Sequence, residues 1–346
     1  MDAYINQIAV ATGDHECHGE FLDFISGWLD DAPLLRRLKD ISAQSAIDRR
    51  YSMVPHLFHA VGGEPAFYGT GANAGTGLRM QTYQRYALPL ALKATRGMNT
   101  AGITDLVVAS CTGYYSPGLD LCLARELGLP GHVRRTLLGH MGCYAAMPAL
   151  RMATDTVRAN PQARVLVVCV ELCSLHLQKN APLDHWIASL LFSDGCAAAL
   201  VSAEKVGPRL DGFHSQLIPD SAGDMRWIIG DHGFEMSLDA RVADKISRSL
   251  SRSAGDICCG LDPHAVDDWA IHPGGRRILD RIEAQLGLPP EALGSSRKIL
   301  AACGNMSSAT VLFVLQDILA NAGTGRHGVA MAFGPGLCVE SLRFQT

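Results

Sequence analysis

Residues 136–170 of the chain read TLLGHMGCYAAMPALRMATDTVRANPQARVLVVCV, and this stretch decides the fold class. A short apolar run at residues 136–138 leads into a glycine turn, and apolar side chains then recur with the spacing of a one-sided helix over residues 144–158. The apolar run at residues 164–170 has the length of a buried strand. Strand, helix and strand in direct succession predict a layered α/β fold.

The same alternation continues on both sides of this stretch and predicts two halves. A strand-like run occupies residues 105–109, and a comparable run at residues 269–271 leads to a second candidate reactive residue. A polar break at residues 202–208 lies between them. We therefore expect an N-terminal half, residues 1–205, and a C-terminal half, residues 206–346. Both repeat one order of elements, which indicates an internal duplication without letter-by-letter identity.

Composition and charge narrow the classes of function. The chain has 346 residues, 48% of them apolar, and 35 glycines, which suits a compact α/β protein. Its 30 basic and 34 acidic residues give a formal net charge of −4, so no positive excess indicates a nucleic-acid partner. The apolar runs are much shorter than the roughly 18 residues that a membrane span requires. We therefore expect small-molecule chemistry, with neither nucleic acid nor membrane as partner.

The cysteines do not predict disulfide bonds. There are 11, an odd number, and some lie inside apolar strand-like runs, as Cys169 and Cys196 do. The first residues have neither the basic nor the apolar region of a secretory signal. We expect free thiols and a cytoplasmic location.

No metal or nucleotide cofactor is expected. The stretch HECH at residues 15–18 has no second ligand pair at zinc-finger spacing, and we interpret it as a solvated segment. The glycine-rich residues 69–77 follow neither the dinucleotide-binding nor the P-loop spacing. We expect them to lead into a helix that begins near Thr76.

Three short stretches, far apart in the chain, supply one candidate catalytic site. They are GHMGCY with Cys143, IHPGG with His272 and CGNMSSA with Asn305. An imidazole can take the proton of a thiol, and imidazole and carboxamide N–H groups can donate to an oxygen on which negative charge develops. Because Cys143 precedes the expected helix, we expect the helix dipole to lower the pKa of its thiol.

Each of these residues also has a structural interpretation when taken alone. A cysteine is by default a buried, inert thiol. A histidine at a strand end is more often a hydrogen-bonded core residue, and an asparagine after a glycine is often a turn or capping residue. The occurrence of all three motifs in one chain favours the catalytic interpretation.

The motifs together resemble the thiolase-like condensing enzymes and, within them, the type III polyketide synthases of the chalcone and stilbene synthase group. The resemblance covers most of the chain. Besides the three motifs it rests on SCTG at residues 110–113, LFSDG at 191–195, GRRIL at 275–279 and FGPGL at 333–337. It implies a thiolase-like fold, a duplicated αβαβα architecture of five layers.

The resemblance implies a role for each catalytic residue. Cys143 takes a starter acyl group from a coenzyme A thioester, and His272 holds the thiolate as an ion pair. His272 and Asn305 then stabilise the enolate that malonyl-CoA forms on losing carbon dioxide, and a Claisen condensation extends the chain. Phe192 matches the family's gatekeeping aromatic residue. No cofactor beyond the thioester substrates is implied, and the product is expected to close to a pyrone, a resorcinol or a related ring.

Further positions are implied to bind substrate. Thr112 and Ser307 belong to the substrate cavity by the resemblance. His176 stands where relatives carry a small residue, so it would narrow the cavity, assist cyclisation or be a hydrogen-bonded structural histidine. Val242 stands near a glycine that shapes the space for the growing chain, which predicts a smaller space.

The expected coenzyme A surface departs from the family's pattern. Plant members bind the phosphates with basic residues in a region that here begins at Arg37 but continues with Asp40, and we expect Arg49 and Arg50 to compensate. Loading from an acyl carrier protein is therefore an alternative. Ser116 matches a position that projects into the partner's cavity in the family, which implies a homodimer.

Three rival functions remain at this point. A single-condensation β-ketoacyl synthase, similar to ketosynthase III, shares the Cys-His-Asn site, and the number of malonyl units consumed per product separates it. A catalytically silent acyl-binding paralogue is disfavoured by the intact triad. A cysteine hydrolase would give the GPGL and GNMSS stretches no role.

Overall fold

The computed structural model describes residues 1–69 and 74–346; residues 70–73, inside the glycine-rich segment, lie outside the described part. Nine strands form one mixed sheet in the order β11-β12-β13-β8-β1-β7-β6-β4-β5. They are β1 (Ala3–Thr12), β4 (Asp105–Ser110), β5 (Arg134–Gly139), β6 (Arg164–Leu172), β7 (Asp194–Ser202), β8 (Arg209–Leu217), β11 (Asp268–Ile271), β12 (His327–Gly334) and β13 (Cys338–Gln345). Smaller sheets pair β2 (His15–Glu16) with β3 (Tyr51–Ser52), and β9 (Met225–Gly230) with β10 (Gly233–Leu238).

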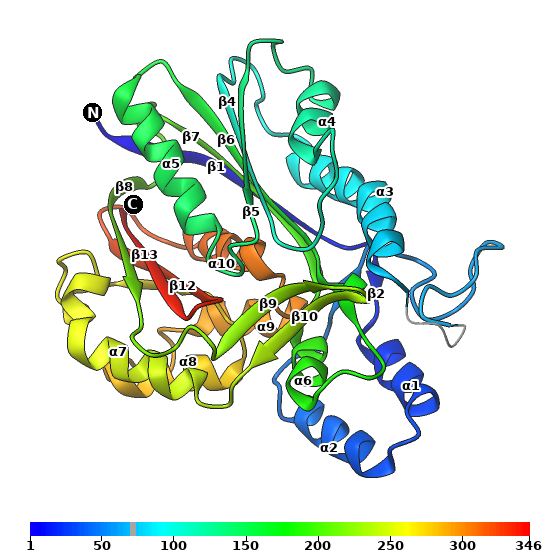
Figure 1. The fold of residues 1–346 in the computed structure, drawn as a ribbon. Coiled ribbons are helices and arrows are strands. Elements are labelled where there is room, and N and C mark those ends of the chain that lie inside the picture. Colours follow the sequence, from blue (N-terminus) through cyan, green and yellow to red (C-terminus); the bar gives the residue numbers. More distant parts are fainter. Residues whose placement is uncertain (70–73) are drawn as a thin grey trace.

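Helices lie on the outer faces of this sheet and in the middle of the molecule (Figure 1). The α-helices are α1 (His18–Trp28), α2 (Ala32–Ala43), α3 (Thr76–Thr95), α4 (Leu119–Glu126), α5 (Ala146–Ala159), α6 (Leu183–Leu191), α7 (Val242–Ile257), α8 (Arg276–Leu286), α9 (Gly294–Cys303) and α10 (Thr310–Leu319). Short 3₁₀ turns are η1 (Cys173–His176), η2 (Pro263–Ala265) and η3 (Ser307–Ala309).

The large sheet consists of two half-sheets with the same internal pattern. In the first, β1 pairs antiparallel with β7, β7 antiparallel with β6, and β6 parallel with β4. In the second, β8 pairs antiparallel with β13, β13 antiparallel with β12, and β12 parallel with β11. The half-sheets join where β1 meets β8, at the pairs Ala3 with Leu210 and Tyr4 with Arg209. This repeat confirms the predicted duplication.

Three apolar cores separate the layers. One lies between α3 and the first half-sheet, and another between the second half-sheet and α7 with α8. The central core contains α5 and α10, which pack between the half-sheets. Figure 1 shows α3 and α7 on opposite sides of the molecule, with α5 and α10 between them. The succession of layers is the five-layer αβαβα architecture that the resemblance implied.

The elements expected from the sequence form, with differences in detail. The helix expected over residues 144–158 begins at Ala146, because a turn occupies the residues from Cys143 onward. The segment expected to be solvated is in part buried, since Cys17 is only 5% exposed and Nδ1 of His18 accepts a hydrogen bond from Arg50. All 11 cysteines are free thiols. No described helix combines the length and apolarity of a membrane span, and the described residues contain no metal-binding group of three His, Cys, Asp or Glu side chains.

Candidate active site

Cys143 lies in a tight turn between β5 and α5. The preceding Gly142 has a φ of +84°, and a Cβ atom there would lie 2.2 Å from Cδ of Pro335. Both the left-handed backbone and the close approach require glycine at this position. The contact places the loop between β12 and β13 against the residue that precedes Cys143, so two distant stretches of the sequence meet here.

His272 follows the last residue of β11, and its backbone N–H donates to the carbonyl oxygen of Met331 at 2.7 Å. The side chain is buried, and neither ring nitrogen has a hydrogen-bond partner among the described residues. Buried polar groups in proteins are nearly always hydrogen-bonded, and exceptions are typical of catalytic groups. The imidazole is therefore available to a thiol or a substrate.

The carboxamide of Asn305 is held in one orientation. Its Oδ1 accepts hydrogen bonds from the backbone N–H of Ser307 at 2.8 Å and from Oγ1 of Thr310 at 3.4 Å. Its Nδ2 donates to the carbonyl oxygen of Gly274 at 3.5 Å, and this leaves the second N–H for a ligand. Asn305 thus orders the turn through its Oδ1 and at the same time presents a donor in a fixed orientation.

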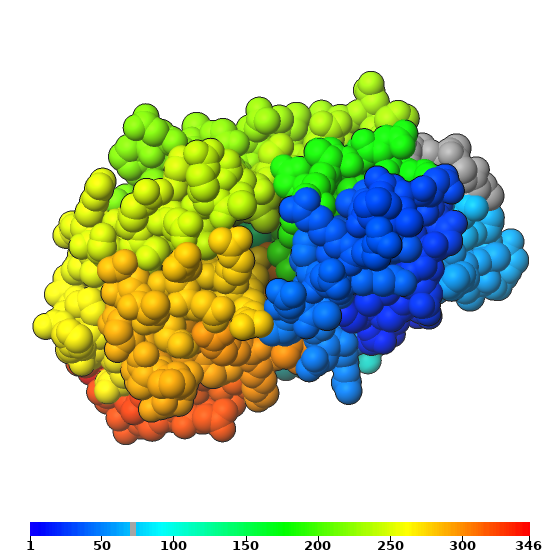
Figure 2. Space-filling view, turned by 90° about the horizontal axis from the view of Figure 1, so that it is seen from below, coloured from blue at the N-terminus to red at the C-terminus, as the bar shows by residue number. Residues whose placement is uncertain are grey.

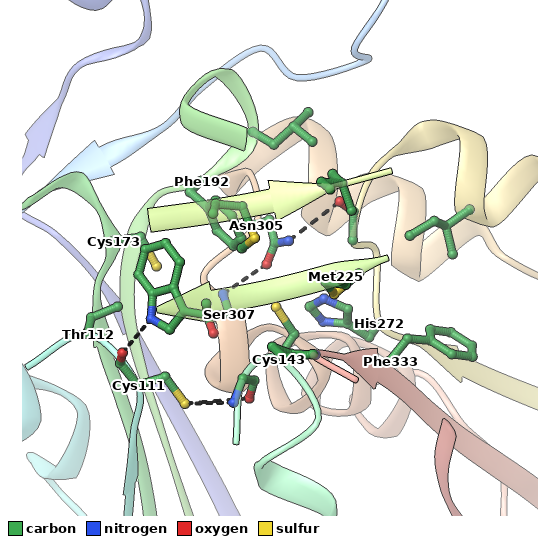
Figure 3. A pocket seen from close by; sticks show the side chains of 18 residues that line it. Cys111, Thr112, Cys143, Cys173, Phe192, Met225, His272, Asn305, Ser307 and Phe333 are labelled. Atoms are coloured by element: carbon green, nitrogen blue, oxygen red, sulfur yellow. Dashed lines mark hydrogen bonds between the residues drawn. The ribbon is translucent and has the colours of Figure 1, made fainter. Parts of the chain in front are cut away.

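The structure brings six of the residues singled out from the sequence around one cavity of about 60 Å³: Thr112, Cys143, Phe192, His272, Asn305 and Ser307. In Figure 3 the thiol of Cys143, the imidazole of His272 and the carboxamide of Asn305 point into the same space. The lining is mostly apolar and includes Leu238 and Ile278. The molecular surface is hollowed where the N-terminal helices in blue, the yellow-green segment of β9 and β10, and the orange segment of α8 and α9 meet (Figure 2).

Burial acts in opposite directions on the thiol and the imidazole. It raises the pKa of Cys143 to about 12, although hydrogen bonds with Ser307 and Asn305 oppose this shift. Burial lowers the pKa of His272 to about 3. The lowered thiol pKa expected from the helix dipole is wrong, because desolvation dominates and α5 begins only at Ala146. A lone charge is disfavoured here, whereas moving the proton from sulfur to imidazole creates both charges together and keeps the net charge at zero.

A buried carboxylate that the sequence analysis missed lies beneath the cavity. Glu171 accepts hydrogen bonds from the backbone N–H of Cys111 at 2.9 Å, from Oγ1 of Thr112 at 2.8 Å and from Oγ of Ser308. Burial raises its pKa to about 7. Oγ1 of Thr112 also accepts from the N–H of Leu172, so the hydroxyl of Thr112 is already engaged within the protein.

The hairpin of β9 and β10 forms one wall of the cavity, and the sequence analysis did not foresee it. Its lining side chains are Met225, Trp227, Met236 and Leu238. Strand pairing in this hairpin runs from Gly230 opposite Gly233 to Met225 opposite Leu238. Two glycines flanking a short turn between apolar runs were the available sequence signal.

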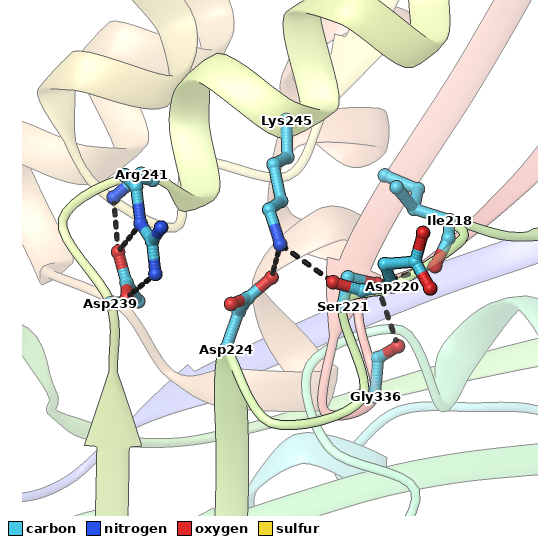
Figure 4. Close-up of polar contacts among 8 residues, drawn as sticks. All are labelled: Ile218, Asp220, Ser221, Asp224, Asp239, Arg241, Lys245 and Gly336. Carbon is cyan, nitrogen blue, oxygen red and sulfur yellow. Dashed lines mark hydrogen bonds and ion pairs between the residues drawn. The ribbon is translucent and has the colours of Figure 1, made fainter.

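Polar contacts fasten the open end of this hairpin to α7 (Figure 4). Lys245 of α7 forms an ion pair with Asp224 and donates to the carbonyl oxygen of Asp220 at 2.8 Å. The N–H of Asp239 donates to the carbonyl oxygen of Asp224 at 2.8 Å, and its carboxylate pairs with Arg241 at 2.7 Å. These contacts hold the two strand ends together and so position the wall.

Two residues expected at the cavity lie outside it. Val242 is the first residue of α7 and packs in the core, whereas Trp227 is among the side chains that line the cavity. His176 donates from Nε2 to the carbonyl oxygen of Thr112 at 2.8 Å and accepts at Nδ1 from the N–H of Phe234 at 3.1 Å. Both ring nitrogens of His176 are thus engaged within the protein, and burial lowers its pKa to about 3, so this ring is a neutral, hydrogen-bonded structural group.

The residues expected at the surface divide into exposed and buried ones. Arg37 on α2 and Ser116 between β4 and α4 are exposed and do not line the cavity. Arg50, which we expected to help bind coenzyme A phosphates, is only 3% exposed. Its Nη1 donates to the carbonyl oxygens of Ser189 and Phe192, at 2.6 and 3.1 Å, so it cannot reach a surface phosphate.

Most of the chain matches the two profiles of one protein family. The profile described as "Chalcone and stilbene synthases, N-terminal domain" matches residues 28–205, and the corresponding "C-terminal domain" profile matches residues 210–346. Among the relatives is the "Alpha-pyrone synthesis polyketide synthase-like Pks18" of Mycobacterium tuberculosis, which is 34% identical over 284 residues, or 77% of this chain and 72% of the relative. The 1,3,6,8-tetrahydroxynaphthalene synthase of Streptomyces peucetius subsp. caesius is 36% identical over 264 residues, or 73% and 70%.

Solved structures agree with these relatives. The crystal structure of PKS-I from the brown alga Ectocarpus siliculosus superimposes with a TM-score of 0.93 at 31% identity and covers 100% of this chain and 98% of that one. The C-terminal type III polyketide synthase domain of Steely1 from Dictyostelium gives a TM-score of 0.89 at 25% identity, with 100% and 99% covered. The ketosynthase alternative is not favoured by these matches. The chain belongs to the chalcone and stilbene synthase family, the type III polyketide synthases.

Proposed function

We propose that Cys143, His272 and Asn305 carry out acyl loading and decarboxylative condensation in this enzyme. The observation that supports this most is an unpartnered imidazole and a fixed carboxamide lining the same mostly apolar cavity as the thiol of Cys143. Acyl transfer needs a base for the thiol, and enolate formation needs donors that are already in place. The three side chains supply both.

Loading begins when His272 takes the proton of Cys143 as sulfur attacks the starter thioester. The bond between the acyl carbon and the sulfur of coenzyme A breaks, and the imidazolium passes its proton to the departing sulfur. His272 is then neutral again and keeps one ring N–H as a donor. The starter acyl group remains on Cys143.

Extension begins when malonyl-CoA loses carbon dioxide. The electron pair of the broken C–C bond passes into an enolate, whose oxygen accepts from Nδ2 of Asn305 and a ring N–H of His272. The enolate carbon attacks the acyl carbon on Cys143, a C–C bond forms, and the C–S bond breaks to return the thiolate. The extended chain is then on coenzyme A and reloads onto Cys143. Phe192, held beside Asn305 by a backbone bridge, closes the cavity to water during these steps.

The substrates are acyl-CoA and malonyl-CoA, and we propose no other cofactor. Residues 1–205 carry the nucleophile and residues 206–346 carry His272 and Asn305. We further propose a homodimer, with Ser116 facing the partner subunit, and a cytoplasmic location. β5 supports the dimer as an exposed edge strand of the large sheet, because such edges pair readily with another chain. We propose coenzyme A rather than a carrier protein as the acyl donor.

Purified protein, labelled malonyl-CoA and a panel of acyl-CoA starters test this function. We expect labelled enzyme, carbon dioxide release, and products that contain two or more malonyl units closed to a pyrone, a resorcinol or a related ring. Cys143→Ala should lose acyl labelling and keep some decarboxylation, whereas Cys303→Ala, outside the cavity, should keep both. Absence of labelling and of carbon dioxide with every starter would contradict the proposal.

A further inference from the structure

A second cavity of about 30 Å³ lies behind the catalytic one. Cys173, Phe192, Trp227 and Met236 line both cavities, so the wall between them consists of side chains. Met236 and the ring of Phe192 can change rotamer without moving the backbone. We call this second space the rear chamber; its lining also includes Arg50.

One of the three guanidinium nitrogens of Arg50 has no hydrogen-bond acceptor. Its Nε donates to Nδ1 of His18 at 3.0 Å, and Nη1 uses its two protons on the carbonyl oxygens of Ser189 and Phe192. Nη2 is buried and has no hydrogen-bond partner among the described residues. Within the same described part of the chain Arg50 forms no ion pair; its charge lies over the ring of Phe21, 4.6 Å from the centroid.

A comparison with Arg79 shows that this is unusual within the same protein. Arg79 is also fully buried and has no carboxylate partner in the described part of the chain. All three of its guanidinium nitrogens, however, donate, to Ala74, Leu175, Leu177 and the hydroxyl of Tyr68. It lines neither cavity. A buried charged donor left unpaired is costly, so the open Nη2 of Arg50 requires an explanation that Arg79 does not.

The other polar groups of the rear chamber do not neutralise this charge. Burial raises the pKa of the Cys17 thiol to about 12, so it stays protonated at neutral pH. His176 and His185 each accept a backbone N–H at Nδ1 and donate from Nε2 to a carbonyl oxygen. The carboxylates of Glu16 and Asp194 act on the charge of Arg50 through space, but neither forms an ion pair with it in the described part of the chain. Asp194 already accepts three hydrogen bonds, from Met53 and Ser174. The rear chamber is therefore a small space lined by a buried guanidinium, one nitrogen of which has no hydrogen-bond partner among the described residues.

We propose that the rear chamber binds a carboxylate at the far end of the starter acyl group on Cys143, with Nη2 of Arg50 donating to it. This inference rests on the proposed function, and it specifies that the starter is a dicarboxylic acid with one carboxyl group joined to coenzyme A as a thioester. A cavity needs roughly 10–15 Å³ for each water molecule, so 30 Å³ suits a terminal carboxylate and is too small for a long alkyl tail. A paired N–H···O⁻ contact would satisfy the buried guanidinium.

The test compares succinyl-, glutaryl- and adipyl-CoA with the neutral acyl-CoA of the same carbon number, each with malonyl-CoA as extender. At one diacid length we expect kcat/KM to exceed that of the neutral starter by roughly tenfold or more, the usual worth of a hydrogen bond to a charged group. Arg50→Met should abolish this preference, and the matched Arg79→Met should keep it. The ratio of two starters on one preparation does not depend on the fraction of folded enzyme.

A second variant covers the case in which Arg50→Met does not fold. Ala188 lines the rear chamber but not the catalytic cavity, and Ala188→Val adds two methyl groups there without removing a hydrogen bond. It should reduce the diacid preference while neutral starters are still extended. Equal or better use of neutral starters at every length, or an unchanged ratio in Arg50→Met or Ala188→Val, overturns the inference. Failure of every starter, with no carbon dioxide release, overturns the proposed function instead.

Discussion

Trp227 donates its indole N–H to the backbone carbonyl oxygen of Cys111 at 2.8 Å, which fastens the wall of the hairpin to the end of β4. The same side chain lines both the catalytic cavity and the rear chamber. It therefore restricts the space for the acyl chain in two directions at once.

Removing this indole should enlarge the space for the acyl group. Trp227→Ala joins the two cavities, so we expect the optimum starter length, measured as kcat/KM across an acyl-CoA series, to move to longer chains. Ile228→Ala, on the exposed neighbour in the same strand, serves as the control and should leave the profile unchanged. A length profile in Trp227→Ala that matches the wild type would show that another wall sets the limit.

The carboxamide of Asn305 offers an isosteric test of enolate stabilisation. Asn305→Asp keeps an oxygen for the N–H of Ser307 but replaces the donor with a negatively charged acceptor. We expect malonyl decarboxylation to fall by about 10²-fold or more, the usual effect of losing such a donor. The same change at the exposed Asn321 should not alter the rate. Unimpaired carbon dioxide release by Asn305→Asp would exclude the carboxamide from this step.

Glu171 should make stability depend on pH. Its folded-state pKa of about 7 lies above the ordinary value of 4.5, so its contribution is most favourable below pH 4.5 and is lost as the pH rises through 7. Glu171→Gln removes this loss. We therefore expect the variant to gain stability relative to the wild type between pH 5 and pH 8, by up to about 3 kcal/mol. Urea unfolding at pH 5 and at pH 8 measures the difference in unfolding free energy between Glu171→Gln and the wild type. If this difference is the same at both pH values, the raised pKa of Glu171 is contradicted.

Gly142 should be less replaceable than other glycines with positive φ. Gly142→Ala introduces left-handed strain and a contact of 2.2 Å with Pro335, whereas Gly287→Ala, at a φ of +61°, has nothing within 4 Å of the new Cβ. Both variants carry about 1–2 kcal/mol of backbone strain. We expect Gly142→Ala to lose about 1–3 kcal/mol more from overpacking, together with acyl loading. Thermal unfolding measures the loss of stability in each variant, and labelling with acyl-CoA measures acyl loading. Equal losses of stability in Gly142→Ala and Gly287→Ala would show that the contact with Pro335 does not matter.

The sequence was sufficient for the fold class and for the three residues that meet in the cavity. Cys143 and Asn305 each follow a glycine and His272 is followed by Pro-Gly-Gly, so all three lie at turns that are visible locally, and the alternation of elements indicates the layers. The choice of Val242 failed because the chain has already left the hairpin and entered α7 at this residue, and its side chain packs in the apolar core. Trp227 could be recognised only once the strands were paired.

Charge states were harder to predict than positions. The helix dipole suggested a lowered pKa for Cys143, but burial, which arises from packing of both halves, has the larger effect. An arginine is expected at the surface, but Arg50 is buried because α1 and α6 pack over it. Desolvation depends on all neighbours at once, and no local pattern reports it.

The central layer has a consequence for how a cell makes this protein. Leu150 of α5 and Leu312 of α10 belong to one apolar core, although α10 leaves the ribosome much later. Until α10 is synthesised, the nascent N-terminal half exposes an apolar surface, through which it can associate with other nascent chains. Translation that pauses soon after β7 is completed would therefore yield aggregates, and rapid synthesis of the remaining residues protects the product.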